Sequence, residues 1–258
     1  MKNTLTKELA VCGFAAVTAL AKNHEASIKR LYFTADRAAA FGELCRSMAK
    51  RRAPYNMVEE PSELEKLCGS VHHQGVVAMI EQPEIPLLDT DVVDEWAQKK
   101  EDALLLDRVG NANNLGAIVR SAAFFGVKNV IIPLDESQSS ITTSSYRVAQ
   151  GGMEFVHIYA IKSIVKLLQF AAGKMERIGT DVTAKMQASG IRASCCGKPA
   201  LLVLGNEEFG ISEDVKKNCD ELVIIPFAGM DSGAAEAPVE SLNVAQAAAV
   251  LLYECRKK

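Results

Sequence analysis

Short apolar runs alternate with helical patterns through the second half of the chain, and this alternation is the feature that most constrains its fold. The predicted strands cover residues 103–106, 130–132, 177–183, 200–204 and 222–225, with a helical turn and one more strand within 144–158. The predicted helices cover residues 115–125, 161–172 and 244–253. Four or five strand–helix units in succession predict a parallel sheet with helices on both faces. Ligands of such a sheet bind at the carboxyl ends of its strands.

The first part of the chain has a separate pattern of the same kind. Helices are expected at residues 10–21 and 37–50, and strands at 30–34, 55–58 and 75–80. These elements predict a small α/β domain over residues 1–81. Residues 82–102 contain seven carboxylates and two prolines, which indicates an acidic linker that would repel RNA, with one short helix around Trp96. The second domain then covers residues 103–258.

The composition narrows the class of protein. A chain of 258 residues with 48% hydrophobic and 24% charged residues can bury a sizeable core. No apolar run approaches the roughly 18 residues of a membrane span, and the N-terminus lacks the apolar core of a signal peptide, so we expect a cytoplasmic protein that binds no membrane. The net charge of −3 argues against a generally basic nucleic-acid binder. The seven cysteines form no C-x-x-C pair and have no histidine at ligand spacing, which favours structural thiols over a metal site.

A strand, a loop and a helix close the chain, and two interpretations apply to the start of the helix. The strand ends in I-P at Ile225 and Pro226, and S-L-N-V at residues 241–244 precedes an alanine-rich helix. Ser241 and Asn243 are good N-capping residues, so capping alone is the structural interpretation. The full string also resembles the third motif of the SpoU/TrmH family of RNA ribose methyltransferases.

Two further stretches carry the same resemblance, in the order that the family has them. N-L-G-A-I-V-R from Asn114 to Arg120 is similar to the first motif, and G-N-E-E-F-G from Gly205 to Gly210 is similar to the second. H-Q-G-V-V-A at residues 73–78 resembles the last strand of the substrate-binding domain that often precedes the family's catalytic domain. The resemblance therefore extends over both predicted domains.

The chain departs from the family pattern at two places. Asn111 and Ala112 stand where the family usually has Asp-Pro, so a negative charge near Arg120 is missing. Residues 230–240 form a longer and more acidic loop than the family has between its I-P and S-L-N strings. These departures motivate an alternative to an active methyltransferase, namely an RNA-binding relative with weakened catalysis. A transferase for a different small molecule is a further alternative.

The resemblance implies an α/β fold of the SPOUT kind, a parallel sheet with a C-terminal trefoil knot, after a small ribosomal-protein-like α/β domain. It implies S-adenosyl-L-methionine as the cofactor, bound in the knot mainly by backbone groups, and structured RNA, either tRNA or rRNA, as the substrate. The expected cofactor contacts are Gly205, Asn206, Gly210, Ile225 and Leu242.

The implied reaction is methyl transfer to a ribose 2′-hydroxyl, and the resemblance assigns five residues to it. An arginine is protonated at any physiological pH, which favours Arg120 as an anchor for a substrate phosphate over a general base. Asn114 would fix the substrate sugar. Ser241 and Asn243 would orient the ribose and Arg120, and Glu207 would order the motif loops. Family members are homodimers whose active sites draw on both subunits, so a homodimer is implied as well.

Two sets of residues in the first domain have open interpretations. His72 and His73 lie near no nucleophile or carboxylate motif, which favours packed over catalytic histidines. The basic run from Lys50 to Arg52 follows a predicted helix. Its charges either meet RNA phosphates or offset the helix dipole.

Overall fold

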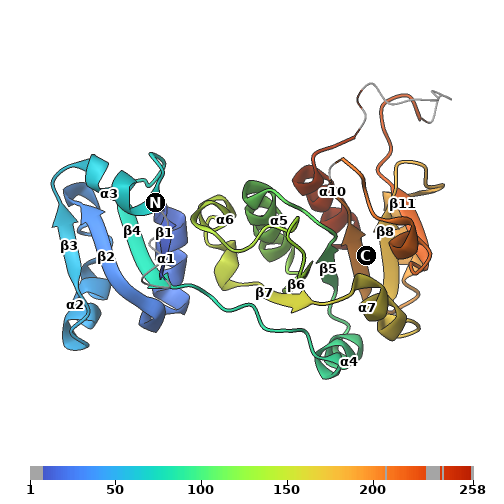
Figure 1. Cartoon of the computed structure of the whole chain (residues 1–258), viewed down its shortest axis with the longest axis horizontal. Helices are drawn as coiled ribbons and strands as arrows, with labels where there is room; N and C mark the ends of the chain where they lie inside the picture. Colours follow the sequence, from blue (N-terminus) through green and yellow to red (C-terminus); the bar gives the residue numbers. More distant parts are fainter. Residues whose placement is uncertain (1–7, 207, 231–238, 240, 257–258) are drawn as a thin grey trace. The chain divides into compact units, whose positions relative to one another are not determined.

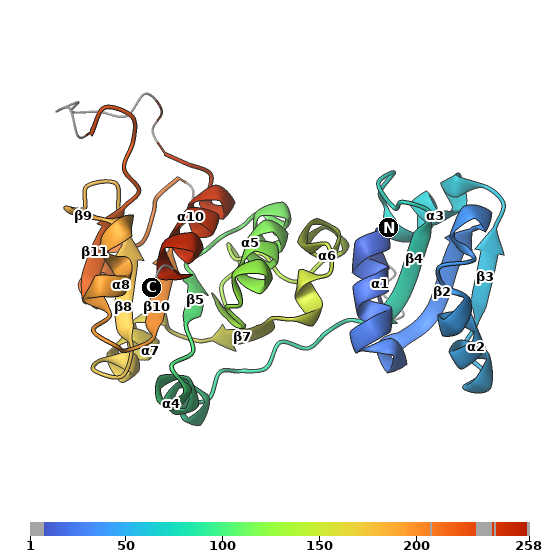
Figure 2. The same ribbon diagram turned by 180° about the vertical axis from the view of Figure 1, so that it is seen from behind.

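The computed structural model describes residues 8–206, 208–230, 239 and 241–256 (Figures 1 and 2). The chain forms two compact units. The first comprises residues 1–84 with 140–155, and the second comprises residues 85–139 with 156–258, so the chain passes between the units three times. Within the described ranges, no helix is long and apolar enough to cross a membrane.

The first unit is built on a mixed sheet of four strands. In sheet order they are β1 (Glu8–Cys12), β4 (Val76–Glu81), β2 (Ile28–Thr34) and β3 (Tyr55–Val58). β4 is antiparallel to both of its neighbours, and β3 runs parallel to β2. The helical elements are α1 (Phe14–Asn23), η1 (Glu25–Ser27), η2 (Ala35–Arg37), α2 (Gly42–Lys50) and α3 (Pro61–Cys68). The strands expected in this part of the chain are confirmed.

Two predicted helices of this unit begin later than expected. The prediction of a helix from residue 10 is wrong, because residues 8–12 form the edge strand β1 and α1 begins only at Phe14. Gly13 has a φ of 101°, which favours glycine and separates the strand from the helix. Likewise, residues 35–41 form η2 and a turn, so α2 covers only the second part of the predicted helix.

Residues 140–155 belong to the first unit although they lie far along the sequence. They form α6 (Thr143–Ala149) and η3 (Gly152–Glu154). Gly151 has a φ of 93°, and a Cβ at this position would lie 2.6 Å from the Cβ of Ala19 in α1. Glu154 Oε2 lies 2.5 Å from Nδ1 of His24. Close packing at a glycine and one polar contact therefore join this segment to the N-terminal part of the unit.

The buried histidine of the first unit has a structural role. His73 is buried, and its Nδ1 accepts a hydrogen bond of 3.1 Å from the N–H of Gly75. His72 is exposed. The interpretation of His73 as a packed, hydrogen-bonded residue is thus confirmed.

The three residues of the basic run, from Lys50 at the end of α2 to Arg52, have different roles. Arg51 donates to the carbonyl oxygen of Glu25 at 3.0 Å and to that of Ala26 at 3.4 Å, so it ties the end of α2 to η1. Lys50 and Arg52 are exposed on either side of it. Arg51 therefore stabilises the unit, whereas the charges of its two neighbours remain accessible.

The second unit contains a parallel sheet, as the sequence predicts, and this sheet has seven strands. In sheet order they are β7 (His157–Ile161), β6 (Asn129–Pro133), β5 (Ala103–Leu106), β10 (Ala200–Leu204), β8 (Glu176–Thr180), β11 (Glu221–Ile224) and β9 (Met186–Gln187). Every neighbouring pair is parallel. The two central strands, β5 and β10, are apolar and buried along their whole length, as expected for a sheet covered on both faces.

Helices cover both faces of this sheet (Figures 1 and 2). One face carries α4 (Thr90–Lys99), α7 (Ile164–Ala171) and α9 (Glu213–Lys216). The other carries α5 (Ala112–Phe125) and α10 (Val244–Arg256), which pack against each other, with η4 (Ala188–Gly190) and α8 (Ile191–Ser194) beside α10. The chain thus has the doubly covered architecture that the alternating pattern predicts.

Part of the stretch expected to be a spacer is packed into the second unit. Trp96 in α4 is only 3% exposed and belongs to the core beneath the sheet with Leu105 and Leu168. The N–H of Leu88 donates to the carbonyl oxygen of Ala160 at 2.9 Å. Most of the segment that leads into the second unit is therefore fixed by its own apolar side chains and backbone.

An ion pair joins β8 to the residue that precedes β11, and it leads to a testable prediction. Arg177 donates to Asp220 through Nε at 2.8 Å and through Nη2, and these bonds lower the pKa of the Asp220 carboxyl from its ordinary value of 3.8. Asp220→Asn should reduce the free energy of unfolding at pH 7 by about 1–3 kcal/mol, because a hydrogen bond to a charged group contributes about that much. Urea unfolding measures this loss.

The pH dependence of the loss has a defined sign. A carboxyl with a depressed folded-state pKa stabilises the fold above its unfolded value, and this stabilisation disappears as the pH falls through the folded value. The difference between wild type and Asp220→Asn should therefore shrink below about pH 4. Glu221→Gln, at the exposed neighbouring residue, is the matched control. An equal loss at pH 7 and pH 3 would contradict the assignment.

Candidate functional site

Two neighbouring strands in the middle of the sheet lead to helices on opposite faces. β5 is followed by α5 on one face, and β10 is followed by α9 on the other. Loops that leave two such strands diverge, and open α/β sheets bind ligands in the crevice between them. The second motif directly follows β10, and the first motif lies in α5, the helix after β5. Both therefore lie at the edge of the sheet where a ligand site is expected.

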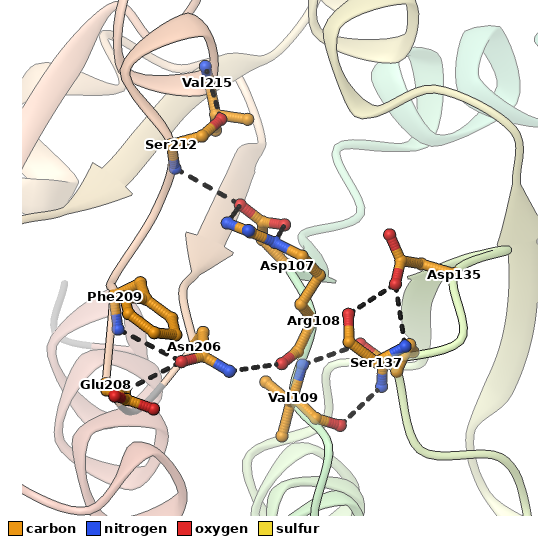
Figure 3. A network of polar contacts seen from close by, with 11 residues as sticks. Asp107, Arg108, Val109, Asp135, Ser137, Asn206, Glu208, Phe209, Ser212 and Val215 are labelled. Carbon is orange, nitrogen blue, oxygen red and sulfur yellow. Dashed lines mark hydrogen bonds and ion pairs between the residues drawn. The ribbon is translucent and has the colours of Figure 1, made fainter.

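The loop after β5 begins with a buried carboxylate. Asp107 is 3% exposed, and its N–H donates to the carbonyl oxygen of Leu204, at the end of β10, at 2.7 Å. Its carboxylate accepts from Nε and Nη2 of Arg108 at 2.8 and 3.2 Å (Figure 3). These bonds raise the pKa of the Arg108 guanidinium. The loop thus pairs a buried negative charge with a cation from the next residue, which offsets the cost of burying it.

A second side chain fixes the next residue of this loop. The N–H of Val109 donates to Oε1 of Gln138 at 2.9 Å, and the carbonyl oxygen of Val109 accepts from Nε2 of Gln138 at 3.0 Å. The N–H of Ser139 donates to the same carbonyl at 2.9 Å. A Cβ on Gly110 would lie 2.9 Å from the carbonyl oxygen of Ser137, so the two loops approach closely there. Gln138 therefore satisfies both backbone groups of Val109, as a neighbouring strand would.

The loop after β10 is organised by the side-chain amide of Asn206 (Figure 3). Its Oδ1 accepts from the N–H groups of Glu208 at 2.9 Å and Phe209 at 3.1 Å. Its Nδ2 donates to the carbonyl oxygen of Arg108 at 2.9 Å. One amide therefore closes the second motif on itself and joins it to the loop that leads into the first motif.

The same turn also closes through its backbone. Asn206 and Gly210 exchange two hydrogen bonds of 3.2 and 2.9 Å, and Gly210 has a φ of 63°. A Cβ on Gly205 would lie 2.2 Å from the carbonyl carbon of Gly210, so the turn requires a glycine there. Glu207, which the sequence assigns to loop ordering, lies outside the described residues. In the described part of this loop, Asn206 performs that ordering.

The first and third motifs meet at the starts of two helices. Nδ2 of Asn243 donates to Oδ1 of Asn114 at 3.1 Å, while Oδ1 of Asn243 accepts from the N–H of Ala245 at 2.9 Å. Capping by Asn243 is therefore confirmed, and the same side chain also joins the third motif to the first. Asn111 caps α5 by accepting from the N–H of Asn113 at 2.8 Å. The departure from Asp-Pro thus removes a charge but keeps a cap.

The remaining predicted site residues make fewer contacts. Arg120 is exposed in the middle of α5, and in the part of the chain that the structure describes no hydrogen bond or ion pair reaches it. Ser241 is exposed, and Leu242 is 44% exposed. Ile225 is half-buried directly after β11. Within a single copy of the chain, Asn114 thus contacts Asn243, and the guanidinium of Arg120 is exposed to solvent.

Sequence reasoning missed the side chains that hold these loops. Asp107 offered a signal, because it is a carboxylate that directly follows a buried apolar strand. Gln138 offered none. It lies in a polar segment, and its contact with Val109 arises only because β5 and β6 are neighbours in the sheet.

Two cysteines of the second unit, Cys195 and Cys255, are packed thiols. Burial raises the pKa of Cys195 to about 11 and that of Cys255 to about 12, so both stay protonated at neutral pH. Within the described ranges, no group of three or more histidine, cysteine, aspartate and glutamate side chains could hold a metal ion.

Comparison with protein families decides the affiliation of the chain. Residues 102–253 match the model of the SpoU rRNA methylase family, and residues 10–86 match the RNA 2′-O ribose methyltransferase substrate-binding domain. The chain belongs to the SpoU rRNA methylase family. The predicted family and its N-terminal substrate-binding domain are thereby confirmed. So is the predicted class of enzyme, an RNA 2′-O-methyltransferase.

Two relatives of this SpoU family member share the name 23S rRNA (guanosine-2′-O-)-methyltransferase RlmB. The protein of Acinetobacter baylyi is 35% identical over 200 residues, which cover 76% of this chain and 75% of the relative. That of Ralstonia nicotianae is 32% identical over 251 residues, which cover 97% and 96% of the two chains. The second alignment spans nearly the whole of both proteins.

A solved structure shares the fold of this SpoU family member. It is the SpoU methyltransferase AviRb from Streptomyces viridochromogenes in complex with AdoMet, with a TM-score of 0.73 and 24% sequence identity over 99% of this chain and 93% of that one. The likeness confirms an α/β fold with a SPOUT-like parallel sheet after an N-terminal mixed-sheet domain.

The contacts of Asn206 lead to a prediction that distinguishes the role of its side-chain oxygen from that of its side-chain nitrogen. Asn206→Ala removes the acceptor for the N–H groups of Glu208 and Phe209, so hydrogen exchange at both amides should accelerate by about tenfold or more. Asn206→Asp keeps the acceptor and removes the donor to the carbonyl of Arg108. It should leave exchange at these two amides slow.

NMR-detected hydrogen exchange on both variants makes the comparison. The N–H of Gly210 is the internal control, because it bonds to the backbone oxygen of Asn206 and not to its side chain. If Glu208 and Phe209 exchanged at wild-type rates in Asn206→Ala, the amide would not order this loop.

Proposed function

We propose that this chain transfers a methyl group from S-adenosylmethionine to the 2′-hydroxyl of a guanosine ribose in ribosomal RNA. One observation carries the proposal. At the carboxyl edge of the parallel sheet, Asn206 of the second motif bonds to the loop that leads into the first motif, at Arg108, and Asn114 of the first motif bonds to Asn243 of the third. The names of the two RlmB relatives support ribosomal RNA and guanosine.

The loops at this edge fit the proposed cofactor. Adenine has apolar faces and polar edges, and pockets for such groups combine apolar side chains with a few backbone amides. Gly205 holds its turn so tightly that a Cβ would overlap Gly210, which leaves backbone groups rather than side chains at the end of β10. Ile225 and Leu242 add apolar surface that is partly exposed. In this proposal these residues bind the cofactor, together with Asn206 through its backbone.

The reaction needs alignment more than acid–base chemistry. The cofactor supplies an activated methyl group on a sulfonium, so the chain must hold the 2′-hydroxyl in line with that group and receive its proton. Arg120 anchors the substrate phosphate beside the hydroxyl, and Asn114 fixes the sugar. Asn243 and Ser241 orient the ribose, and Glu207 is assigned to the motif loops by resemblance alone.

The proposal assigns a task to each part of the chain. Residues 1–81 form the RNA substrate-binding domain, residues 82–102 connect it to the catalytic domain, and residues 103–258 form the SpoU methyltransferase domain. The trefoil knot of the family fold is part of this assignment. The family models, whose matches cover residues 10–86 and 102–253, support it.

We include a homodimer in the proposal, since the ends of α5 and α10 carry exposed aromatic residues. Phe124 is 83% exposed and Tyr253 is 53% exposed. Phe125 lies between them, with ring centroids 5.2 Å from Phe124 and 6.3 Å from Tyr253. A cluster of exposed aromatic rings is typical of a surface that a partner covers. A second copy would also supply surroundings for the guanidinium of Arg120.

The test of the function begins with Arg120. Arg120→Ala should lower kcat/KM for RNA methylation by about 10- to 150-fold, the effect of losing a hydrogen bond between charged groups. Cofactor affinity should stay at the wild-type value, because the cofactor residues lie in other loops. Arg120→Lys should not restore activity, since a point charge cannot reproduce a bidentate guanidinium contact. Calorimetry with S-adenosylmethionine and methyl transfer to rRNA measure the two quantities.

Two outcomes would overturn this assignment. Wild-type activity in Arg120→Ala would make Arg120 a bystander, and joint loss of folding and cofactor binding would make it structural. Mapping of 2′-O-methylated riboses in RNA from cells that lack the protein identifies the substrate. RNA binding without S-adenosylmethionine binding by the wild type would favour the alternative, an RNA-binding relative with weakened catalysis.

The dimer has its own test. Phe124→Glu places a charge in the aromatic cluster and should shift the protein from dimer to monomer in sedimentation equilibrium, because an unpaired carboxylate is costly to bury. Phe155→Glu, at another exposed phenylalanine, is the control and should leave the mass unchanged. An unaltered mass in Phe124→Glu would exclude this cluster as the dimer contact.

A further inference from the structure

A large aromatic side chain is exposed within the second motif. Phe209 is 71% exposed in the turn between Gly205 and Gly210. A phenylalanine ring left in water gives up the free energy of burying its apolar surface. The loop could carry a small polar residue at the same place without changing its backbone bonds. Its exposure leaves an aromatic face that a ligand could cover.

The backbone beneath this ring is held rigidly. The N–H of Phe209 donates to Oδ1 of Asn206 at 3.1 Å, and the N–H of Glu208 donates to the same oxygen at 2.9 Å (Figure 3). The two backbone bonds between Asn206 and Gly210 close the turn. A ring on such a turn loses little further freedom when it binds, so the entropy cost of covering it is small.

The ring belongs to the proposed catalytic edge. The amide that holds its N–H also donates to the carbonyl oxygen of Arg108 at 2.9 Å, and this loop continues into α5, where Asn114 contacts Asn243. Phe209 is therefore fixed, through one side chain, to the loop that carries the first motif. Any RNA whose ribose reaches Asn114 and Asn243 brings its bases to the same edge.

A negative charge beside the ring repels the phosphates of an RNA but not its bases. Glu208 is exposed next to Phe209, and its carboxylate repels phosphates. A base has no net charge, and its donor groups are compatible with a carboxylate. Proteins recognise unpaired RNA bases by stacking them on aromatic side chains and by hydrogen bonds to their edges. A base, rather than the backbone, is thus the part of the substrate that fits this surface.

We propose that Phe209 is the platform on which an unpaired base of the substrate RNA stacks while the ribose is methylated. The inference rests on the proposed function and adds a substrate-binding residue that the family motif does not assign. It also specifies the substrate: the nucleotide at the site, or its neighbour, must be unstacked from its own helix.

The experiment compares substitutions that test whether RNA binding needs an aromatic ring at this position or only an apolar side chain. Phe209→Ala should weaken binding of the methylated rRNA fragment by about 5- to 150-fold, the range for loss of one base–aromatic stack. Phe209→Tyr should retain wild-type affinity, and Phe209→Leu should resemble Phe209→Ala. Phe155→Ala removes an exposed phenylalanine of the first unit and should have no effect. Affinity for S-adenosylmethionine and the mass in solution should be unchanged in all four variants.

A second probe does not depend on catalysis. A single-stranded oligoribonucleotide carrying 2-aminopurine loses fluorescence when this base stacks on an aromatic ring, so wild type and Phe209→Tyr should quench it and Phe209→Ala should not. Failure of the wild type to methylate any RNA would overturn the proposed function. The fluorescence probe would still measure whether a base stacks on Phe209. Methylation with wild-type affinity and quenching in Phe209→Ala would overturn the platform alone.

Three other results would also overturn it. Full activity in Phe209→Leu would mean that apolar bulk suffices. A parallel loss of S-adenosylmethionine affinity in Phe209→Ala would place the adenine of the cofactor on the ring. A change in mass would make the ring part of a contact between two copies.

Discussion

The amide of Asn206 is the contact on which the candidate site depends. Three backbone groups from two loops bond to this one side chain, and both loops leave central strands of the sheet. A backbone group left unpaired in a partly buried loop costs free energy comparable to a lost hydrogen bond. The amide satisfies donors and an acceptor at once, which an aspartate at the same position could not do, because an ionised carboxylate only accepts hydrogen bonds.

The parallel sheet explains why these loops meet. β5 and β10 are neighbours, and their helices leave for opposite faces, so the polar segments after them diverge around a common edge. Apolar strands buried on both faces hold this edge in place. The ion pair of buried Asp107 with half-buried Arg108 and the two bonds of Gln138 to Val109 then fix the β5 loop against its neighbours. Rigid strands and side-chain clamps together position a site that is made of loops.

Electrostatics favour recognition at particular residues over attraction by the whole surface. The net charge of −3 provides no general attraction for RNA. Lys50 and Arg52 are exposed in the first unit, whereas Arg51 is engaged with the carbonyl oxygens of η1. Arg120 is exposed in the second unit. Cations at separate positions and one exposed ring at Phe209 are consistent with an enzyme that selects a folded RNA by shape and by an unpaired nucleotide.

The sequence by itself determined the parallel sheet, the bounds of β5 and β10, the Asn243 cap of the last helix and the order of the motifs, because each depends on local periodicity or on a string of adjacent residues. Only the tertiary structure decided that residues 8–12 are a strand, since β1 exists by pairing with β4. It alone assigned residues 140–155 to the first unit and brought Gln138 to Val109 and Asn243 to Asn114. These features join residues distant in sequence, and no local pattern encodes which strands and loops become neighbours.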